Sequence, residues 1–382
     1  MTVWDPLRGN VTILALERQV STGDIAHSWL LLGPRGAGKT SASLAMAASV
    51  NCPVAPAVGC GECSSCLRIL RRRHPDVHHV SAEGAFILVD QIRESVIAIA
   101  SRSPFEGRRK VFIVEEADRM NPSAQNALLK TLEEPFEDTL IILLSAREEE
   151  LLDTIKSRCR MVHLQRVAEE QIATMLEREG TSPEKALLAA RVCEGDFQRA
   201  LVLVSSPSAW DRRSLWLSIP RRLVSAVDAL DAAAEIVAEA RTAAKEREGE
   251  QKAEVTELAE AMGEGRGTGS VRTALAKRHR RELRRTEETV LSDALDVLGS
   301  FYRDALALRA GGEAVANLDR LDELRTWADS PTSDSAFVGA IEACVAARSA
   351  LFKNANVALT IENALLELAR RVPAAATLST PS

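Results

Sequence analysis

Residues 33–40 constrain the fold of this chain more than any other feature, and they read Gly-Pro-Arg-Gly-Ala-Gly-Lys-Thr. They fit the pattern G-x4-G-K-T without a mismatch. An apolar run precedes them at 28–32, and a stretch rich in Ala and Leu follows, which predicts a helix from about Gly38. Glycines let backbone amides turn around an anion, and the helix start adds a positive dipole end. The pattern therefore predicts a strand, a phosphate-binding loop and a helix.

Each residue of this loop has an expected role. Lys39 can reach the β- and γ-phosphates of a nucleotide, and the Thr40 hydroxyl can ligate Mg²⁺. Gly33, Gly36 and Gly38 supply the backbone freedom. We predict nucleotide binding here; the alternative is a chance match or a loop that binds nothing.

The first 165 residues alternate apolar runs of strand length with helical segments. We expect strands at 28–32, 111–114 and 140–144, and a fourth beginning at His78. We expect helices at 89–100 and 123–133, the second capped by Asn121 or Ser123. This alternation predicts an α/β fold with a parallel sheet and helices on both faces.

After about Gln165 the strand signal fades. Short helices are expected at 168–178, 183–192 and 197–204, then a linker at 205–208, then only helices to about Arg371. The predicted domains are 1–165, 166–206 and 207–375, followed by a tail at 376–382.

The segment 239–288 interrupts the last region with dense charge. We interpret it as two exposed helical arms flanking a glycine-rich turn, with a basic run at 277–285 on the second arm. It is either a solvated helical face or a contact for DNA or an acidic partner.

Four of the seven cysteines lie close together, at Cys52, Cys60, Cys63 and Cys66. In a cytosolic chain such a cluster indicates a metal site before it indicates disulfides. Four thiolates meet the tetrahedral demand of a closed, structural Zn²⁺ site. An iron–sulfur cluster and four free thiols remain as alternatives.

Acidic residues follow the expected strand at 111–114. In a phosphate-loop ATPase a first carboxylate holds the Mg²⁺ sphere and a second orients the attacking water. Glu115 stands at the first position, where Asp is usual, and Glu116 at the second. Alternatively, these acids only cap a strand end at a solvated edge.

Two further polar residues follow the expected strand at 140–144. Ser145 at its end could sense the γ-phosphate. Arg158, in Ser-Arg-Cys at 157–159, is too far along the chain to serve its own loop easily. In an oligomer it could enter a neighbour's nucleotide site; by spacing alone it is also typical of a surface ion-pair residue.

Several motifs now stand in one order: the phosphate loop, the four cysteines, His74-Pro-Asp76, the run Asn-Ala-Leu-Leu-Lys-Thr-Leu-Glu-Glu-Pro at 126–135, and Ser-Arg-Cys at 157–159. Over residues 10 to about 205 this order resembles the gamma/tau and delta-prime subunits of the bacterial DNA polymerase III clamp loader, members of the AAA+ superfamily. The resemblance implies an AAA+ core, a small helical lid and an all-α collar that joins subunits.

The resemblance also implies roles. Arg158 matches an arginine finger offered in trans to an adjacent ATP site. Lys39, Thr40, Glu116 and Ser145 match ATP-handling positions, and the cysteines match a zinc module. The implied partners are the gamma/tau and delta subunits and, through the assembly, the sliding clamp and primer-template DNA.

Two departures favour a delta-prime-type stator with doubtful hydrolysis of its own: Glu115 at the strand end, and Gln198 in the column of a lid arginine, with Arg199 one residue later. The alternatives are a gamma/tau-type motor subunit and a nucleotide-binding adaptor outside replication.

Composition adds exclusions. A net charge of −6 disfavours generic electrostatic coating of DNA. The chain has no run of about 18 apolar residues, so the sequence predicts no membrane span. Residues 1–10 lack a signal pattern, so we expect a cytoplasmic, replisome-associated protein.

Overall fold

A computed structural model describes residues 2–7, 10–23, 25–82, 86–262, 268–313, 315–352 and 355–374. The chain divides into two compact units, Met1–Ser205 and Ser206–Ser382. Each unit is described by itself.

The first unit is built on a five-stranded parallel sheet of order β2-β3-β4-β1-β5. The four expected strands are confirmed as β1 (Ser28–Leu32), β2 (Val77–Val80), β3 (Lys110–Val114) and β4 (Thr139–Ser145). A fifth, β5 (Arg160–His163), was not predicted, because only two of its four residues are apolar and none is fully buried at this sheet edge. Since all strands are parallel, the loops that follow them gather at one edge of the sheet.

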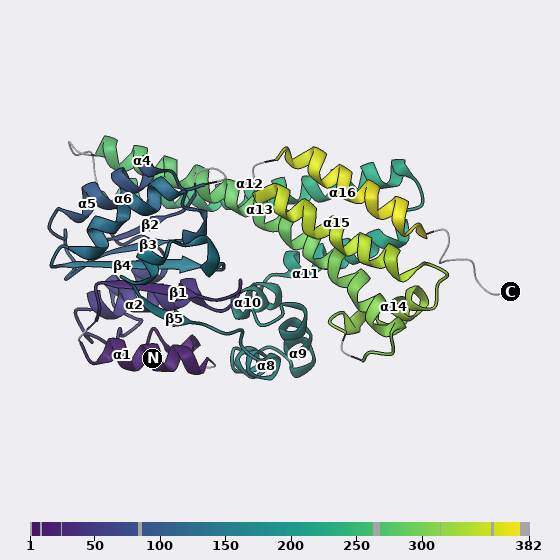
Figure 1. The fold of residues 1–382 in the computed structure, drawn as a ribbon, viewed down its shortest axis with the longest axis horizontal. Helices are drawn as coiled ribbons and strands as arrows, with labels where there is room; N and C mark the ends of the chain where they lie inside the picture. Colours follow the sequence, from purple (N-terminus) through teal and green to yellow (C-terminus); the bar gives the residue numbers. More distant parts are fainter. Residues whose placement is uncertain are drawn as a thin grey trace. The chain divides into compact units, whose positions relative to one another are not determined.

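Helices cover both faces of this sheet, as predicted (Figure 1). One face carries α1 (Val11–Ser21), α2 (Lys39–Asn51) and α3 (Ser64–Leu70). The other carries α4 (Val89–Ile92), a π-helical turn (Arg93–Ile97), α5 (Ala98–Ala100) and α6 (Pro122–Glu133). Asn121 caps α6 by accepting a hydrogen bond from the Ala124 amide at 2.8 Å. The expected α/β core, a parallel sheet with helices on both faces, is thus present.

After the sheet the first unit continues with α7 (Asp153–Lys156) and three further helices, α8 (Glu169–Arg178), α9 (Pro183–Val192) and α10 (Phe197–Ser205). Their bounds differ from the expected ones by at most one residue. The expected linker at 205–208 is different: α10 ends at Ser205, and Ser206 caps the next helix by accepting from the Ala209 amide at 3.3 Å. A proline at the first helical position explains why this Ser/Pro stretch starts a helix instead of a loop.

The second unit is entirely helical in its described residues, as predicted. Its main helices are α11 (Pro207–Arg222), α12 (Ala226–Met262), α13 (Thr268–Arg309), α14 (Leu321–Ala328), α15 (Asp334–Phe352) and α16 (Val357–Arg371). Phe301 and Tyr302 pack edge-to-face against Trp327 in its core, with centroid distances of 5.7 and 6.1 Å.

The charged segment 239–288 lies on α12 and α13, so its two helical arms are confirmed. The turn at 263–267 and most side chains of the basic run lie outside the described residues. Gln251 and His279 are buried, which corrects the expectation that both arms are exposed throughout. After α16, Ala374 is buried and donates its amide to the Leu223 carbonyl at 3.1 Å. The expected tail at 376–382 lies outside the described residues.

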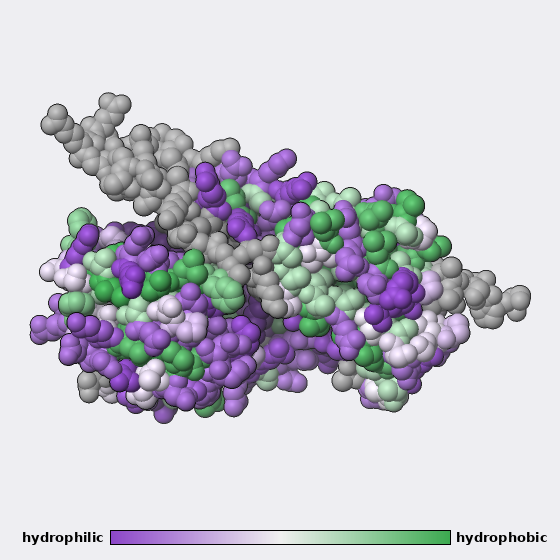
Figure 2. Space-filling model, turned by 45° about the horizontal axis from the view of Figure 1, so that its top comes forward, coloured by the Kyte–Doolittle hydropathy of each residue, from purple (hydrophilic) through white to green (hydrophobic). Residues whose placement is uncertain are grey.

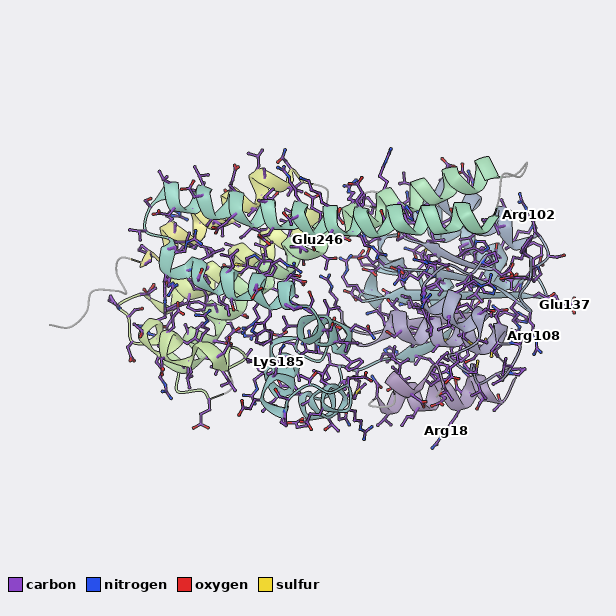
Figure 3. All side chains as sticks on the ribbon, turned by 180° about the vertical axis from the view of Figure 1, so that it is seen from behind. Arg18, Arg102, Arg108, Glu137, Lys185 and Glu246 are labelled. Atoms are coloured by element: carbon purple, nitrogen blue, oxygen red, sulfur yellow. The ribbon has the colours of Figure 1, made fainter. Side chains whose placement is uncertain are left out.

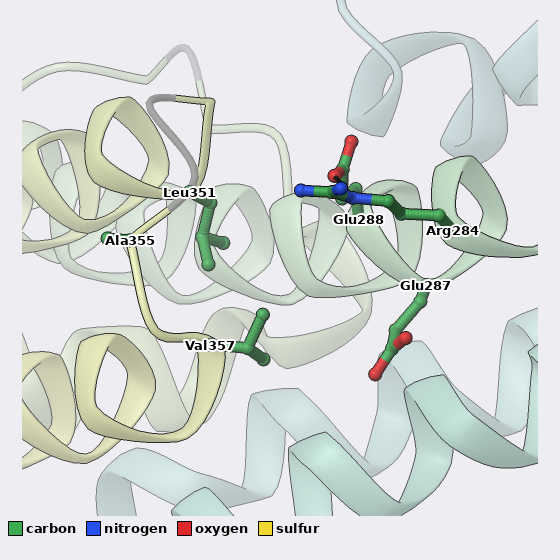
Figure 4. Close-up of a pocket in the computed structure, with 6 residues that line it drawn as sticks. All are labelled: Arg284, Glu287, Glu288, Leu351, Ala355 and Val357. Atoms are coloured by element: carbon green, nitrogen blue, oxygen red, sulfur yellow. Dashed lines mark hydrogen bonds and ion pairs between the residues drawn. The ribbon is translucent and has the colours of Figure 1, made fainter. Parts of the chain in front are cut away.

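Charged side chains such as Arg18, Arg102 and Glu137 point outward from the first unit (Figure 3). On the face seen in Figure 2, hydrophilic and hydrophobic residues are mixed. Among the described helices, none combines the length and apolar character that crossing a bilayer requires. A small hollow in the second unit, shown in Figure 4, is lined by three apolar residues and three charged ones: Leu351, Ala355, Val357, Arg284, Glu287 and Glu288. Arg284 Nε donates to Glu288 at 3.0 Å.

The sheet also makes a pH prediction. His78 on β2 stacks on Phe112, with ring centroids 5.0 Å apart, and burial lowers the pKa of His78 to about 4. An unfolded histidine titrates near 6.5, so the unfolded chain binds more protons between these values. We expect His78 to cost roughly 1–3 kcal/mol of stability as pH falls from about 6.5 toward 4. Urea unfolding of His78→Gln should show a shallower loss than the wild type; equal slopes would contradict the assignment.

Candidate functional site

The phosphate loop joins β1 to α2 at the carboxyl edge of the sheet, and its glycines are required by geometry. Gly36 and Gly38 have left-handed backbone, with φ of 83° and 84°. A Cβ on Gly33 would stand 2.2 Å from the Leu164 carbonyl oxygen, so no side chain fits there. A Cβ on Gly36 would stand 2.5 Å from the Cβ of Asp196, which lies just before α10. The loop is thus bounded on one side by Leu164, which directly follows β5, and on another side by Asp196.

Lys39 lies within this loop. Its Nζ donates to the carbonyl oxygens of Gly33 and Pro34 at 2.6 and 2.8 Å. Burial lowers the pKa of the Lys39 ammonium, and the nearby carboxylates of Asp118 and Asp196 oppose that shift. The Lys39 ammonium therefore lies against the backbone of the glycine loop. Thr40 is the next residue, in the first turn of α2.

Ser145 at the end of β4 is fully buried, and its partner is an acid that we had not assigned a role. The Ser145 hydroxyl donates to Asp118 Oδ1 at 3.1 Å, and Arg147 Nε donates to Asp118 Oδ2 at 3.1 Å. Asp118 also acts on the charge of Lys39. The carboxylate that links Ser145 to the loop is thus Asp118. Asp118 is the last residue of the acidic segment 115–118. The sequence of this segment does not show which of its acids faces the loop.

The two acids that were singled out have other contacts. Glu115 is 2% exposed, and its Oε1 lies 2.7 Å from Arg72 Nη1 and 3.7 Å from His79 Nδ1. Glu116 has left-handed backbone, and its carboxylate accepts from Arg119 Nη1 at 2.9 Å. The role of Glu115 at Mg²⁺ stays a prediction, and the structure weakens it, because a guanidinium already balances this carboxylate.

Arg158 follows α7 and is one-third exposed. Its Nη1 donates to the Thr154 carbonyl at 3.0 Å, and its Nη2 forms an ion pair with Glu133 at the end of α6. The structure therefore places the proposed finger on the surface of its unit, in contact with the run 126–135. Its role in trans stays a prediction.

The four cysteines form a compact cluster. Their sulfur atoms all lie within 4.8 Å of one another, and Cys52 Sγ is 3.7 Å from Cys60 Sγ and 3.9 Å from Cys63 Sγ. A tetrahedral site with metal–sulfur bonds of about 2.3 Å has sulfur–sulfur edges of about 3.8 Å. The cluster therefore fits a single Zn²⁺ better than a multi-iron cluster, which needs more room between the sulfurs. Backbone N–H groups of Glu62 and Cys63 lower the pKa of the Cys60 thiol to about 6, which favours the thiolate that a metal requires.

His74-Pro-Asp76 links this cysteine cluster to the sheet. Asp76 accepts three backbone N–H bonds, from Phe105, Glu106 and Gly107, at 2.6, 2.9 and 2.7 Å. Burial acts to raise the pKa of Asp76, but these bonds outweigh it and the pKa is lowered. The motif is thus an anchor for the loop that enters β3, and it has no direct part in the phosphate site.

A parallel sheet with a glycine loop and a half-buried lysine after its first strand, and with a serine at the end of the neighbouring strand, is the arrangement of a phosphate-loop α/β fold. Residues 10–168 match the family model described as "DNA polymerase III, delta subunit". Over this region the chain is similar to the delta' and tau subunits of bacterial DNA polymerase III.

Three relatives and one solved structure show the extent of this similarity. DNA polymerase III subunit delta' of Bacillus subtilis is 35% identical over 177 residues, 46% of this chain and 54% of that protein. Subunit delta' of Pseudomonas aeruginosa is 44% identical over 137 residues, covering 35% and 42%. Subunit tau of Escherichia coli is 33% identical over 204 residues, covering 52% and 31%. The match thus spans about half or less of each relative. A DNA polymerase III gamma subunit-related protein from Thermotoga maritima aligns over 94% of this chain and 99% of its own, with 19% identity and a TM-score of 0.47.

Proposed function

We propose that this chain is a delta-prime-type subunit of the DNA polymerase III clamp loader, working in the cytoplasm at the replisome. In this role it assembles with gamma/tau and delta subunits that place the sliding clamp on primed DNA. It binds ATP, and it lends Arg158 to a neighbouring subunit's ATP site. Residues 166–206 act as the lid, and residues 207–375 as the collar.

The observation that carries this proposal is the position of Arg158. Its guanidinium is partly exposed at the end of a short helix and contacts Thr154, Ser157 and Glu133. An exposed ion pair of this kind contributes little stability, so exchanging Glu133 for a triphosphate on another subunit costs little. Positive charge supplied in trans is what phosphoryl transfer needs as charge develops on the γ-phosphate.

The residues of the loop support ATP binding by this chain itself. The backbone of Gly36 and Gly38 turns amides toward a phosphate, and Lys39 supplies the positive charge among them. Thr40 is the residue placed to ligate Mg²⁺, which when bound shields the phosphate charge. Ser145, fixed by Asp118, offers a polar contact near the γ-phosphate, and Glu116 is the candidate for orienting water.

A gamma/tau-type motor subunit is the second candidate. The phosphate loop is complete, and the match to subunit tau extends over 204 residues. The pairing of Glu115 with Arg72 favours the delta-prime assignment, because a neutralised acid is poorly suited to hold the metal of an active ATPase.

Reconstitution with gamma/tau and delta subunits tests the proposal. We expect Arg158→Ala to lower primed-DNA-stimulated ATP turnover by about tenfold or more, because arginine fingers contribute large factors to phosphoryl transfer. Arg178→Ala, a matched loss of an exposed arginine on α8, should leave turnover unchanged. Full turnover with Arg158→Ala would refute the finger role. Hydrolysis by the isolated chain that Lys39→Ala abolishes would instead establish the motor type.

A further inference from the structure

Arg72 has a backbone conformation that its residue type disfavours. It follows α3 with φ of 58°, in the left-handed region that suits glycine. A non-glycine residue there costs on the order of 1 kcal/mol, and such strain persists only where surrounding contacts hold it. Two backbone hydrogen bonds of a helix C-cap hold this conformation: the Arg72 amide donates to the Ile69 carbonyl at 2.8 Å, and the Arg73 amide donates to the Arg68 carbonyl at 2.7 Å. The conformation directs the Arg72 side chain to an ion pair with Glu115.

This ion pair is more than a surface contact. The Glu115 side chain is 3% exposed, whereas the Arg72 side chain is 35% exposed, so the guanidinium reaches inward to the acid. A carboxylate this deeply buried needs an opposite charge beside it. Arg72 supplies that charge at 2.7 Å.

The alternation of side chains along β3 shows where Glu115 lies. Val111 and Ile113 pack in the cluster that contains α2, whereas Phe112 and Val114 pack in the cluster on the opposite face. Glu115 continues the series on the α2 side, which is the side of Lys39 and Thr40. One strand, β4, separates β3 from β1, so the two strand ends are about 10 Å apart.

We propose that Arg72 keeps Glu115 in an ion pair and so prevents this carboxylate from binding the divalent ion of the nucleotide site. Arg72 is a positioning residue: it acts through Glu115 and touches no substrate. The proposal rests on the proposed function, because it assumes that the loop binds ATP.

The helix α3 connects the Arg72–Glu115 ion pair to the cysteine cluster. Cys63 caps α3 by accepting from the Cys66 amide at 3.4 Å, and the Arg72 amide donates to Ile69 at the other end of the helix at 2.8 Å. The guanidinium that neutralises Glu115 is therefore positioned by the helix that carries Cys66 and is capped by Cys63.

Binding of a fluorescent ATP analogue, measured in EDTA and in Mg²⁺, tests this inference on the full chain. We expect Mg²⁺ to change the wild-type affinity little. In Arg72→Gly, which also relieves the backbone strain, Mg²⁺ should tighten binding about tenfold, as freeing one nearby carboxylate predicts. Arg71→Ala, the same charge change on the exposed neighbour, should behave as the wild type does. Arg72→Gly/Glu115→Gln should lose the gain.

The outcomes separate the two proposals. If every variant binds the analogue with one and the same Mg²⁺ response, the Arg72 inference is overturned and ATP binding stands. If the gain persists in the double variant, Glu115 is not the acid involved and the inference is overturned as well. If neither wild type nor variants bind the analogue in either buffer, both proposals fail. Arg72→Gln should show the same Mg²⁺-dependent gain in affinity for the analogue. This variant takes the place of Arg72→Gly if Arg72→Gly does not fold.

Discussion

We predict that the cysteine cluster binds Zn²⁺ and that loss of this metal destabilises the first unit more than any single substitution elsewhere in it. Structural Zn²⁺ sites of this type contribute on the order of 10 kcal/mol in small domains, because the ligands are brought together only by folding. Cys52 and Cys66 are buried and join the segment after α2 to α3. Cys66→Ser leaves the ion one thiolate short, so the loop between these helices should lose its order.

Zinc content by mass spectrometry and thermal unfolding measure this effect together. Cys66→Ser should lose the bound zinc and unfold at a markedly lower temperature. Cys344→Ser removes a buried thiol of the second unit and should keep a full equivalent of zinc. A wild-type protein without zinc, or Cys66→Ser with an unchanged zinc content, would show that the four thiols serve no metal.

Arg213 is expected to be the most sensitive position of the second unit. It is 2% exposed, and its guanidinium binds both carboxylate oxygens of Asp319, at 2.6 and 2.8 Å. It also donates to Asn317 Oδ1 at 2.7 Å and stacks over Trp210. Burial alone would raise the pKa of Asp319, but the arginine lowers it. Removing one partner of such a pair leaves the other charge uncompensated.

We therefore expect Arg213→Ala to lower the free energy of unfolding by about 3–5 kcal/mol. Arg221→Ala, which removes an exposed arginine from the same helix, should change it by less than about 0.5 kcal/mol. Replacing both partners, as Arg213→Met/Asp319→Leu, should recover part of the loss, because no charge is then left alone. Urea unfolding followed by circular dichroism measures all three; an Arg213→Ala protein as stable as Arg221→Ala would contradict the assignment.

The elements that the sequence predicted well are those whose signals are local. The apolar runs of β1, β3 and β4 are buried at every position. The phosphate loop can be recognised from the spacing of its glycines. The edge strand β5 escaped prediction because one side of it has no neighbouring strand, so its composition is mixed. The linker predicted at 205–208 contains the boundary between the two units, but only Ser206 in it lies outside a helix, because serine and proline favour a helix start as much as a loop.

The site was predictable only in part, for the same reason. Spacing brought the four cysteines together correctly. It could not show that Asp118 contacts Ser145, or that Arg72 faces Glu115, because these pairs are 27 and 43 residues apart along the chain and meet only through the sheet. Which of several acids at a strand end turns toward a ligand is decided by tertiary packing.

The closeness of Asp196 to Gly36 has an electrostatic consequence. The carboxylate that begins α10 touches the backbone on which a phosphate would rest, and it shares the field of Lys39. Because like charges repel, we expect a phosphate bound in the loop to repel the Asp196 carboxylate. Phosphate binding and the position of the start of α10 should then be coupled electrostatically.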